Sequence, residues 1–299
     1  MLVSYHPAYA HPLPKSHRFP MEKYDLIYGQ LHLEGFSDDA IWNRPCPLDP
    51  IEILKCHTSE YWNKIRTGSW SRAEERKSGF TWSHALVLRE SIIMNGTLGC
   101  ALEAVRGGIG LNIAGGTHHA FSNRAEGFCL LNDFAISAQH LLDNTETNRV
   151  LIVDLDVHQG NGTAAMTQTD DRVFTFSMHA ESNYPFHKEH STLDIPLPDG
   201  TTDHEYLEQL ENHLHDIFSR FAPQVVFYQC GVDVLSSDKL GKLSLTMRGS
   251  QERDSMVLEM CRKHNVGVAC AMGGGYSEDV SVIVEAHMQT FRLARDLWC

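Results

Sequence analysis

Short apolar runs rich in β-branched residues alternate along the chain with longer stretches in which apolar residues return every three or four positions. The short runs predict buried strands at residues 1–4, 110–114, 150–155, 173–177, 224–229 and 266–272. The longer stretches predict helices at residues 80–105, 132–142, 203–221, 250–264 and 278–297. Strands that alternate with helices are typical of a mainly parallel sheet covered by helices on both faces. We therefore predict an α/β fold.

No repeat, low-complexity tract or linker divides the 299 residues, so we predict a single domain over residues 1–299. The hydrophobic content of 42% and the charged content of 21% are those of a globular protein. No apolar run reaches the roughly 20 residues that span a bilayer, and the N-terminus lacks a signal-peptide pattern. Eight cysteines without a C-x-x-C pair fit a reducing compartment. These features predict a cytoplasmic protein that binds no membrane.

The net charge is −13, which argues against duplex nucleic acid as the main ligand. Such acidity would attract a cationic substrate, although solubility alone explains it equally well.

Polar residues follow each predicted strand. In an open parallel sheet, ligands bind outside the carboxyl ends of the strands. Six strands that deliver histidine, aspartate or tyrosine to one edge predict an enzyme. The residues concerned are Tyr5, His6, His118, His119, Asp154, Asp156, His158, Met178, His179, Asp233 and Tyr276.

Asp154, Asp156 and His158 alternate at the end of one apolar run, and residues two apart in a strand face the same side. These aspartates could simply cap the following loop. Burying two unpaired carboxylates is costly, however, and this favours a metal site. Asp233, which follows a second apolar run, supplies the best third ligand, although alone it could also be a loop cap. An Asp2His site leaves one position for water and substrate. The oxygen-rich set suits zinc but does not exclude Fe(II) or Co(II).

The adjacent pair His118-His119 is weak evidence alone, because 18 histidines make one such pair expected by composition. Its position after a strand makes it a candidate general base, with Asp154 and Asn161 as orienting partners.

Gly273-Gly-Gly-Tyr276 has two interpretations. The glycines could only permit a tight turn, with Tyr276 packed as an aromatic. Alternatively, they let the backbone approach the metal and place the phenol beside a developing oxyanion. No phosphate-binding pattern accompanies them.

These motifs, in this order, resemble those of the zinc-dependent histone deacetylase family and its bacterial relatives. The resemblance spans about residues 110–280. Gln159 and the segment 233–244 are most similar to the class IV branch. The matching pieces are Gly115-Gly-Thr-His118-His119-Ala120, Gly127-Phe128-Cys129-Leu-Leu-Asn132-Asp133, Asp154-Leu-Asp156-Val-His158-Gln-Gly-Asn161-Gly162, Cys230-Gly-Val-Asp233 and Gly273-Gly-Gly-Tyr276.

The resemblance implies a three-layer arginase–deacetylase fold with about eight strands and a deep tunnel. It implies that Asp156, His158 and Asp233 hold zinc, that His119 is the general base, and that Tyr276 binds the oxyanion. His118, paired with Asp154, would be the electrostatic partner, and Asn161 would orient His119. The implied tunnel residues are Gly127, Phe128, Tyr184, Leu240 near the foot, and Gly274. A structural K⁺ would use Asp154, Asp156, His158, Ser177 and Met178.

Two positions depart from the family pattern. Asn161 stands where some branches have an aspartate behind the second histidine. Lys23 stands where many members have an arginine at the tunnel foot. Residues 68–79 could form a rim loop in which Glu74 or Glu75 contacts the substrate backbone, but an exposed helical turn is favoured.

The expected activity is hydrolysis of acetyl, or longer acyl, groups from Nε-acyl-lysine in proteins. One alternative is deacetylation of acetylpolyamines or other small acylated amines by the same site. A binuclear arginase-like hydrolase is less favoured. Another alternative, from a different class, is a non-catalytic acyl-lysine-binding module. The residues do not predict the physiological substrate, the acyl length or the oligomeric state.

Overall fold

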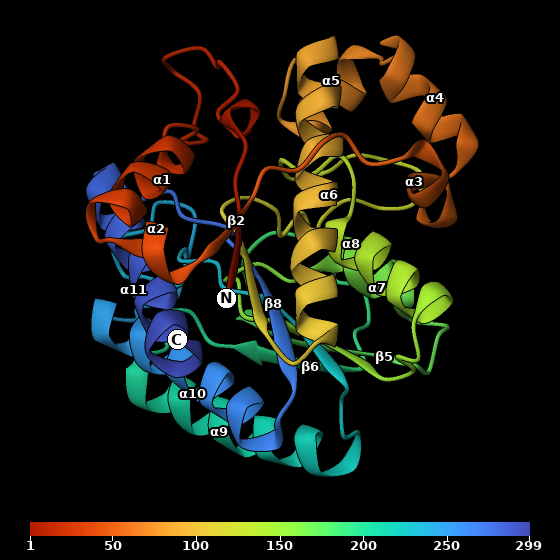
Figure 1. The fold of residues 1–299 in the computed structure, drawn as a ribbon. Coiled ribbons are helices and arrows are strands. Elements are labelled where there is room, and N and C mark those ends of the chain that lie inside the picture. The colour runs from red at the N-terminus through yellow and green to blue at the C-terminus, as the bar shows by residue number, and fades with distance from the viewer.

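Eight strands form one sheet, in the order β2-β1-β3-β8-β7-β4-β5-β6, and every neighbouring pair is parallel. The computed structural model describes residues 1–299 (Figure 1). The strands are β1 (Leu2–Ser4), β2 (Ile41–Asn43), β3 (Ile109–Asn112), β4 (Val150–Asp154), β5 (Val173–Ala180), β6 (Leu193–Leu197), β7 (Val225–Gln229) and β8 (Gly267–Ala271). The predicted parallel sheet of an arginase–deacetylase fold is therefore confirmed.

Helices cover both faces of this sheet, with α6 and α7 on one face and α9, α10 and α11 on the other (Figure 1). A short 3₁₀ helix, η1 (Pro7–Tyr9), follows β1. The α-helices are α1 (Lys23–Leu33), α2 (Phe36–Asp39), α3 (Pro50–Cys56), α4 (Ser59–Thr67), α5 (Arg72–Ser78), α6 (His84–Val105), α7 (Asp133–Asn144), α8 (Asn161–Thr167), α9 (Asp203–Arg220), α10 (Met247–His264) and α11 (Val280–Trp298).

The central strands are apolar on both faces because each face packs against helices. In β4, Val150 and Ile152 join a buried cluster with Phe134 of α7. The alternate residues Leu151 and Val153 join the larger cluster on the other face, which includes residues of α9 and α10. The unbroken apolar run that predicted this strand is thus the sequence of a strand buried on both sides.

The six predicted strands and five predicted helices are present, with boundaries shifted by a few residues. Strands β2 and β6 were missed, and both lie at the edges of the sheet. β2 has only three residues, with Ile41 exposed, and β6 contains Pro196, so neither forms an apolar run. Five further helices, α1 to α4 and α8, were also missed, whereas α5 lies where a helical turn was favoured.

Helix α6 is long and apolar enough, by length and composition, to cross a membrane, although 72% of its most apolar window is buried inside the protein. It packs against β3, β8 and α7 as a central helix of one layer. Its apolar sequence is therefore explained by burial in the core.

Candidate active site

Three potential metal ligands meet at the carboxyl ends of two neighbouring strands. Asp156 and His158 follow β4, Asp233 follows β7, and these two strands pair in the sheet. One ligand atom from each lies within 4.8 Å of the others, and all three side chains are buried. The spacing of Asp156 and His158 and the choice of Asp233 as third ligand thus predicted residues that the structure brings together.

The electrostatics of this cluster favour a bound cation. Burial raises the pKa of Asp233 to about 7, and the nearby charge of Asp156 adds to the rise. His158 Nδ1 lies 3.0 Å from Asp156 Oδ1 and 3.1 Å from Asp233 Oδ2. A divalent cation among these atoms would neutralise two buried carboxylates that otherwise share one imidazole. The residues therefore fit a metal site with three protein ligands and an open position.

Glycines make room for these carboxylates. A Cβ at Gly274 would collide with the Asp233 carboxylate, and a Cβ at Gly231 would collide with that of Asp156. The Gly274 amide donates a hydrogen bond to Asp156 Oδ2 at 3.1 Å. The glycine-rich turn thus lets the backbone come close to the ligand carboxylates. This agrees with the second of the two interpretations of the motif.

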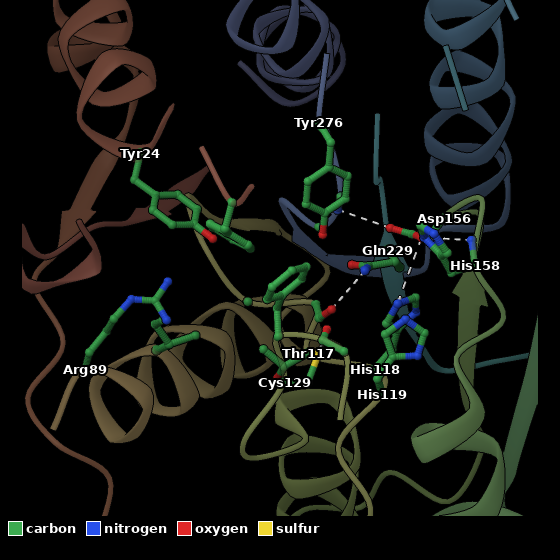
Figure 2. A pocket seen from close by; sticks show the side chains of 18 residues that line it. Tyr24, Arg89, Thr117, His118, His119, Cys129, Asp156, His158, Gln229 and Tyr276 are labelled. Carbon is green, nitrogen blue, oxygen red and sulfur yellow. Dashed lines mark hydrogen bonds and ion pairs between the residues drawn. The ribbon is translucent and has the colours of Figure 1, made fainter. Parts of the chain in front are cut away.

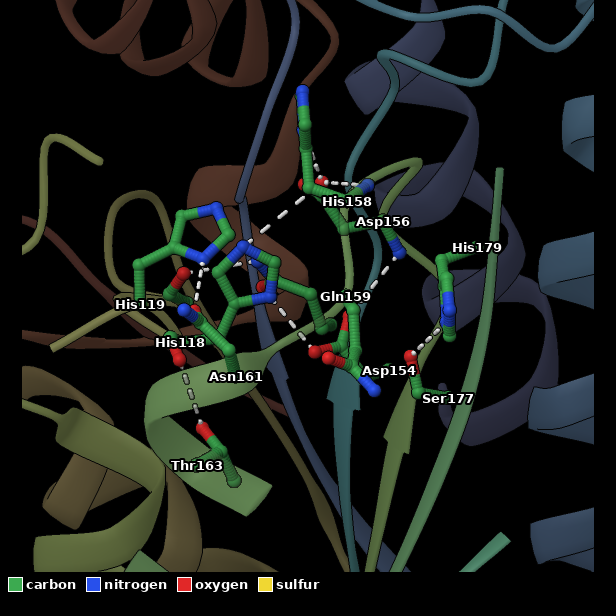
Figure 3. A network of polar contacts seen from close by, with 12 residues as sticks. His118, His119, Asp154, Asp156, His158, Gln159, Asn161, Thr163, Ser177 and His179 are labelled. Atoms are coloured by element: carbon green, nitrogen blue, oxygen red, sulfur yellow. Dashed lines mark hydrogen bonds and ion pairs between the residues drawn. The ribbon is translucent and has the colours of Figure 1, made fainter. Parts of the chain in front are cut away.

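The two adjacent histidines have different partners (Figure 3). His118 Nδ1 lies 2.7 Å from Asp154 Oδ2, whereas His119 Nδ1 lies 2.7 Å from the amide oxygen of Asn161. Burial lowers the pKa of His118, but the charges of Asp154 and Asp156 outweigh it and raise the pKa to about 9. Burial and the positive charge of His118 hold the pKa of His119 well below its usual range. The pair therefore combines a charged and a neutral imidazole.

Glu126 fixes the orientation of the Asn161 amide. Asn161 Nδ2 donates to Glu126 Oε1 at 3.3 Å, and Tyr184 and Arg124 donate to the same carboxylate. Because a carboxylate only accepts, the amide oxygen faces His119 and the His119 Nδ1 carries the proton. His119 Nε2 is left with its lone pair.

Tyr276 enters the pocket from the side opposite His118 and His119 (Figure 2). Its backbone amide donates to Asp238 Oδ2 at 2.6 Å, while Asp238 Oδ1 accepts from the amides of Leu240 and Gly241. This carboxylate therefore joins the tyrosine loop to the loop that follows β7.

Lys23 is fully buried beneath the glycine turn, as expected for a residue at the tunnel foot. Its Nζ donates to the carbonyl oxygen of Gly273 at 2.7 Å. Burial lowers its pKa to about 8 against the opposing charges of Asp233 and Asp156.

The predicted tunnel residues divide between an inner pocket and an outer cavity. Gly127, Phe128 and Gly274 line the inner pocket together with Asp156, His158 and Tyr276, and Gly127 and Phe128 also line the outer cavity. Tyr184 and Leu240 line an outer cavity of about 630 Å³. The expectation that Leu240 lies near the foot is wrong, because Leu240 is absent from the inner pocket and its carbonyl oxygen accepts a hydrogen bond from Asn183 beside the outer cavity.

The segment 68–79 contains helix α5, in agreement with the favoured helical turn. Ser71 and Glu74 form a capping box, and Glu74 also pairs with Lys64 at 3.1 Å. Glu75 Oε1 accepts a hydrogen bond from the Trp82 amide at 2.9 Å. Both carboxylates therefore form hydrogen bonds or ion pairs within α5 and with its neighbours.

Of the residues expected around K⁺, Asp154 ends β4, Asp156 and His158 follow it, and Ser177 and Met178 lie on β5, where Ser177 pairs with Asp154. The Ser177 hydroxyl lies 3.0 Å from His179 Nδ1, and Asp154 Oδ1 accepts from the Asp156 amide. Met178 is buried. The potassium site stays a prediction.

Gln159, the basis of the class IV resemblance, points away from the metal cluster. Its amide donates to Glu189 O and Asp194 Oδ1, both at 2.8 Å. It therefore joins the ligand loop to the segment around β6, and the class assignment stays a prediction.

Two residues that support the ligand loops were missed from the sequence. Arg253 of α10 is buried and donates to the carbonyl oxygens of Leu155 and Gly231, which lie beside the ligands. Asp133 accepts hydrogen bonds from the Gly116 and Thr117 amides of the histidine loop. Asp133 stood inside a matching motif, whereas nothing in the helical pattern around Arg253 indicated its role.

Comparison with known proteins agrees with this geometry. The histone deacetylase domain family matches residues 17–291. An uncharacterized protein of Picosynechococcus sp. is 41% identical over 99% of both chains. Histone deacetylase 2 of Arabidopsis thaliana is 27% identical over 91% of this chain and 73% of its own. The crystal structure of an HDAC homolog from Aquifex aeolicus superposes with a TM-score of 0.83 at 26% identity, covering 98% of this chain and 83% of that one.

Proposed function

The chain belongs to the histone deacetylase family, and we propose that it is a metal-dependent hydrolase that removes acetyl or longer acyl groups from Nε-acyl-lysine. One observation carries the proposal: Asp156 and His158 of a buried Asp2His cluster line one pocket together with a neutral histidine and a tyrosine. These are the groups that amide hydrolysis requires. Zinc is the proposed metal, with Fe(II) and Co(II) as alternatives.

Asp156, His158 and Asp233 would hold the metal, which supplies a Lewis acid toward the amide carbonyl and the attacking water. His119 Nε2 accepts a proton from that water as the water oxygen adds to the carbonyl carbon. Tyr276 donates a hydrogen bond to the resulting oxyanion. When the carbon–nitrogen bond breaks, His119 returns the proton to the leaving amine. The products are a carboxylate and a lysine side chain with a free amino group.

Asp154 and His118 contribute a fixed charge next to the reacting groups. In the metal-free protein the charge of Asp154 outweighs burial and raises the pKa of His118 to about 9, which favours its positively charged form. That charge opposes protonation of His119 before the reaction and so keeps the base available. The amide of Asn161 orients His119 without adding a second negative charge.

The depth of the pocket supports a long, thin substrate group. Gly127, which has a φ of +54°, passes so close to the His119 ring that a side chain there would collide with it. Phe128 lines both the inner pocket and the outer cavity. An acylated lysine presents its amide at the end of a four-carbon chain and suits such a passage.

Tyr276→Phe tests the proposal, because loss of one oxyanion donor costs about 10²–10³ in rate. We expect turnover of an acetyl-lysine peptide to fall by this factor while the metal content and the fold are kept. Tyr28→Phe is the matched control, since Tyr28 stacks on Tyr5 outside the pocket. Wild-type activity in Tyr276→Phe would refute the assignment.

A further inference from the structure

Four cations and one carboxylate line the outer cavity, although the protein as a whole has a net charge of −13. The cations are Arg18, Arg76, Lys77 and Lys242, and the carboxylate is Glu126. The mouth of the proposed active site thus has the opposite sign to the rest of the molecule.

These cations come from three separate segments. Arg18 lies between η1 and α1, Arg76 and Lys77 lie in the last turn of α5, and Lys242 follows β7. The segment before α1 and helix α5 lie at the same end of the molecule (Figure 1). Basic residues in a last helical turn can simply complement the helix dipole. That explanation covers Arg76 and Lys77 but leaves Arg18 and Lys242 unexplained.

Most of this positive charge is free to meet a ligand. Arg18, Arg76 and Lys77 are exposed and form no ion pair, whereas Lys242 lies 3.5 Å from Asp199. Glu126 is already engaged by Tyr184, Arg124 and Asn161. The one carboxylate in the cavity is therefore unable to compensate the cations around it.

We propose that this cationic mouth selects polypeptides in which acidic side chains flank the acyl-lysine. The inference rests on the proposed function and specifies its substrate class. A polyamine carries further ammonium groups, which the four cations would repel. A long polyanion such as RNA would meet the acidic surface beyond the mouth, whereas a short acidic stretch would not. Phe186 lines the same cavity with 85% of its surface exposed and offers an apolar contact to a peptide.

The test uses three acetyl-lysine peptides that differ only in two flanking residues on each side: Glu, Gln or Lys. Exposed charge pairs contribute roughly a factor of two each, so pairs with the three unpaired cations should raise kcat/KM for the Glu peptide about eightfold above that for the Gln peptide. The Lys peptide should be the poorest substrate. The preference should shrink at high ionic strength, because salt screens exposed charges.

The double variant R76Q/K77Q should lower the Glu-to-Gln ratio toward one. R66Q/R72Q is the matched control, since it removes two exposed cations from α4 and α5 that do not line the outer cavity. The control should keep the wild-type ratio. Equal kcat/KM for all three peptides, a preference for the Lys peptide, or an equal loss in both double variants would overturn the proposal.

Binding separates this proposal from the proposed function. Fluorescence anisotropy with the labelled peptides and the His119→Ala protein needs no turnover. Tighter binding of the Glu peptide, weakened in the R76Q/K77Q background, would support the cationic mouth even if no peptide were hydrolysed. A single-stranded RNA oligonucleotide serves as a competitor in the same assay. If the RNA displaces the Glu peptide and binds more tightly than the peptide does, the assignment to polypeptides is overturned.

Discussion

His118 and His119 are neighbours in the sequence and almost equally buried, yet their surroundings differ in charge. His118 faces the carboxylate of Asp154, whereas His119 faces the amide of Asn161. The carboxylate outweighs burial and raises one pKa, while burial and the neighbouring cation lower the other. The partner of a buried histidine, more than its burial, therefore decides whether it holds a proton.

This difference supports the separate roles proposed for the two histidines. A neutral imidazole can accept a proton, and a charged one can only stabilise negative charge or return a proton. We therefore propose that the Asp154 side of the site acts electrostatically and that the Asn161 side holds the general base. Each of the following predictions alters one half and compares it with the other.

Removing the base should have the largest effect. His119→Ala should lower kcat by about 10²–10⁴, the usual contribution of a general base. His118→Ala should cost less, because it removes a charge and leaves the base in place. Steady-state rates on one acetyl-lysine peptide, with zinc content and circular dichroism as controls, compare the two. Equal losses would contradict the division of roles.

Asp154→Asn should have the next largest effect, because it removes the charge that favours the protonated His118. We expect a loss of about 10–100-fold in activity or metal affinity, as is typical when a residue behind the reacting groups is changed. Asn161→Asp is the opposite exchange, and it would add a negative charge beside Glu126. Metal content measured with the rates separates loss of metal from loss of turnover.

Glu126→Ala should reduce kcat by up to about tenfold, since the Asn161 amide could then turn its nitrogen toward His119. In an Asn161→Asp background, Glu126→Ala should change kcat little. Both oxygens of a carboxylate can accept a hydrogen bond from His119, so rotation of the side chain has no effect. The double-mutant cycle measures this coupling. A loss of equal size in both backgrounds would mean that Glu126 acts only through Arg124 and Tyr184.

The smallest effect concerns the stability of the metal-free protein. The pKa of His118 is raised to about 9, above its usual value near 6.5, so its stabilising contribution is complete below pH 6.5 and is lost as the pH rises through 9. The wild type should be more stable than His118→Gln below pH 6.5. Between pH 6.5 and 9 we expect this advantage in the free energy of unfolding to shrink by roughly 1–3 kcal/mol. His119 acts in the opposite sense, since its lowered pKa costs stability as the pH falls below 6.5. Urea unfolding at several pH values measures both; a difference that stays constant up to pH 9 would contradict the His118 assignment.

The sequence predicted the residues that stand at strand ends, because chain direction and alternation place them at one edge of the sheet. This rule brought Asp156, His158 and Asp233 together, and the alternating Asp-x-His spacing favoured them as ligands. It also explains the central strands, whose apolar runs reflect burial on both faces. The edge strands escaped prediction because both are partly exposed, β2 has only three residues, and β6 contains Pro196.

Contacts between distant segments could not be predicted in the same way. Glu126 reaches Asn161 from 35 positions away, and Arg253 reaches Leu155 from 98 positions away. Neither contact leaves a periodic signal in the sequence. The positive charge of the mouth could not be predicted for the same reason. The net charge of the chain does not reveal which segments meet in the fold.

The most direct test of the proposed function is release of acetate from a neutral acetyl-lysine peptide by protein loaded with one equivalent of zinc, Fe(II) or Co(II). We predict that each turnover yields one acetate and one deacetylated lysine side chain in the peptide. Activity should be lost on chelation and should recover when metal is restored. Asp233→Ala should remain inactive after the same reconstitution. Folded, metal-loaded wild type that releases no acetate, or Asp233→Ala that retains full activity, would contradict the proposed function.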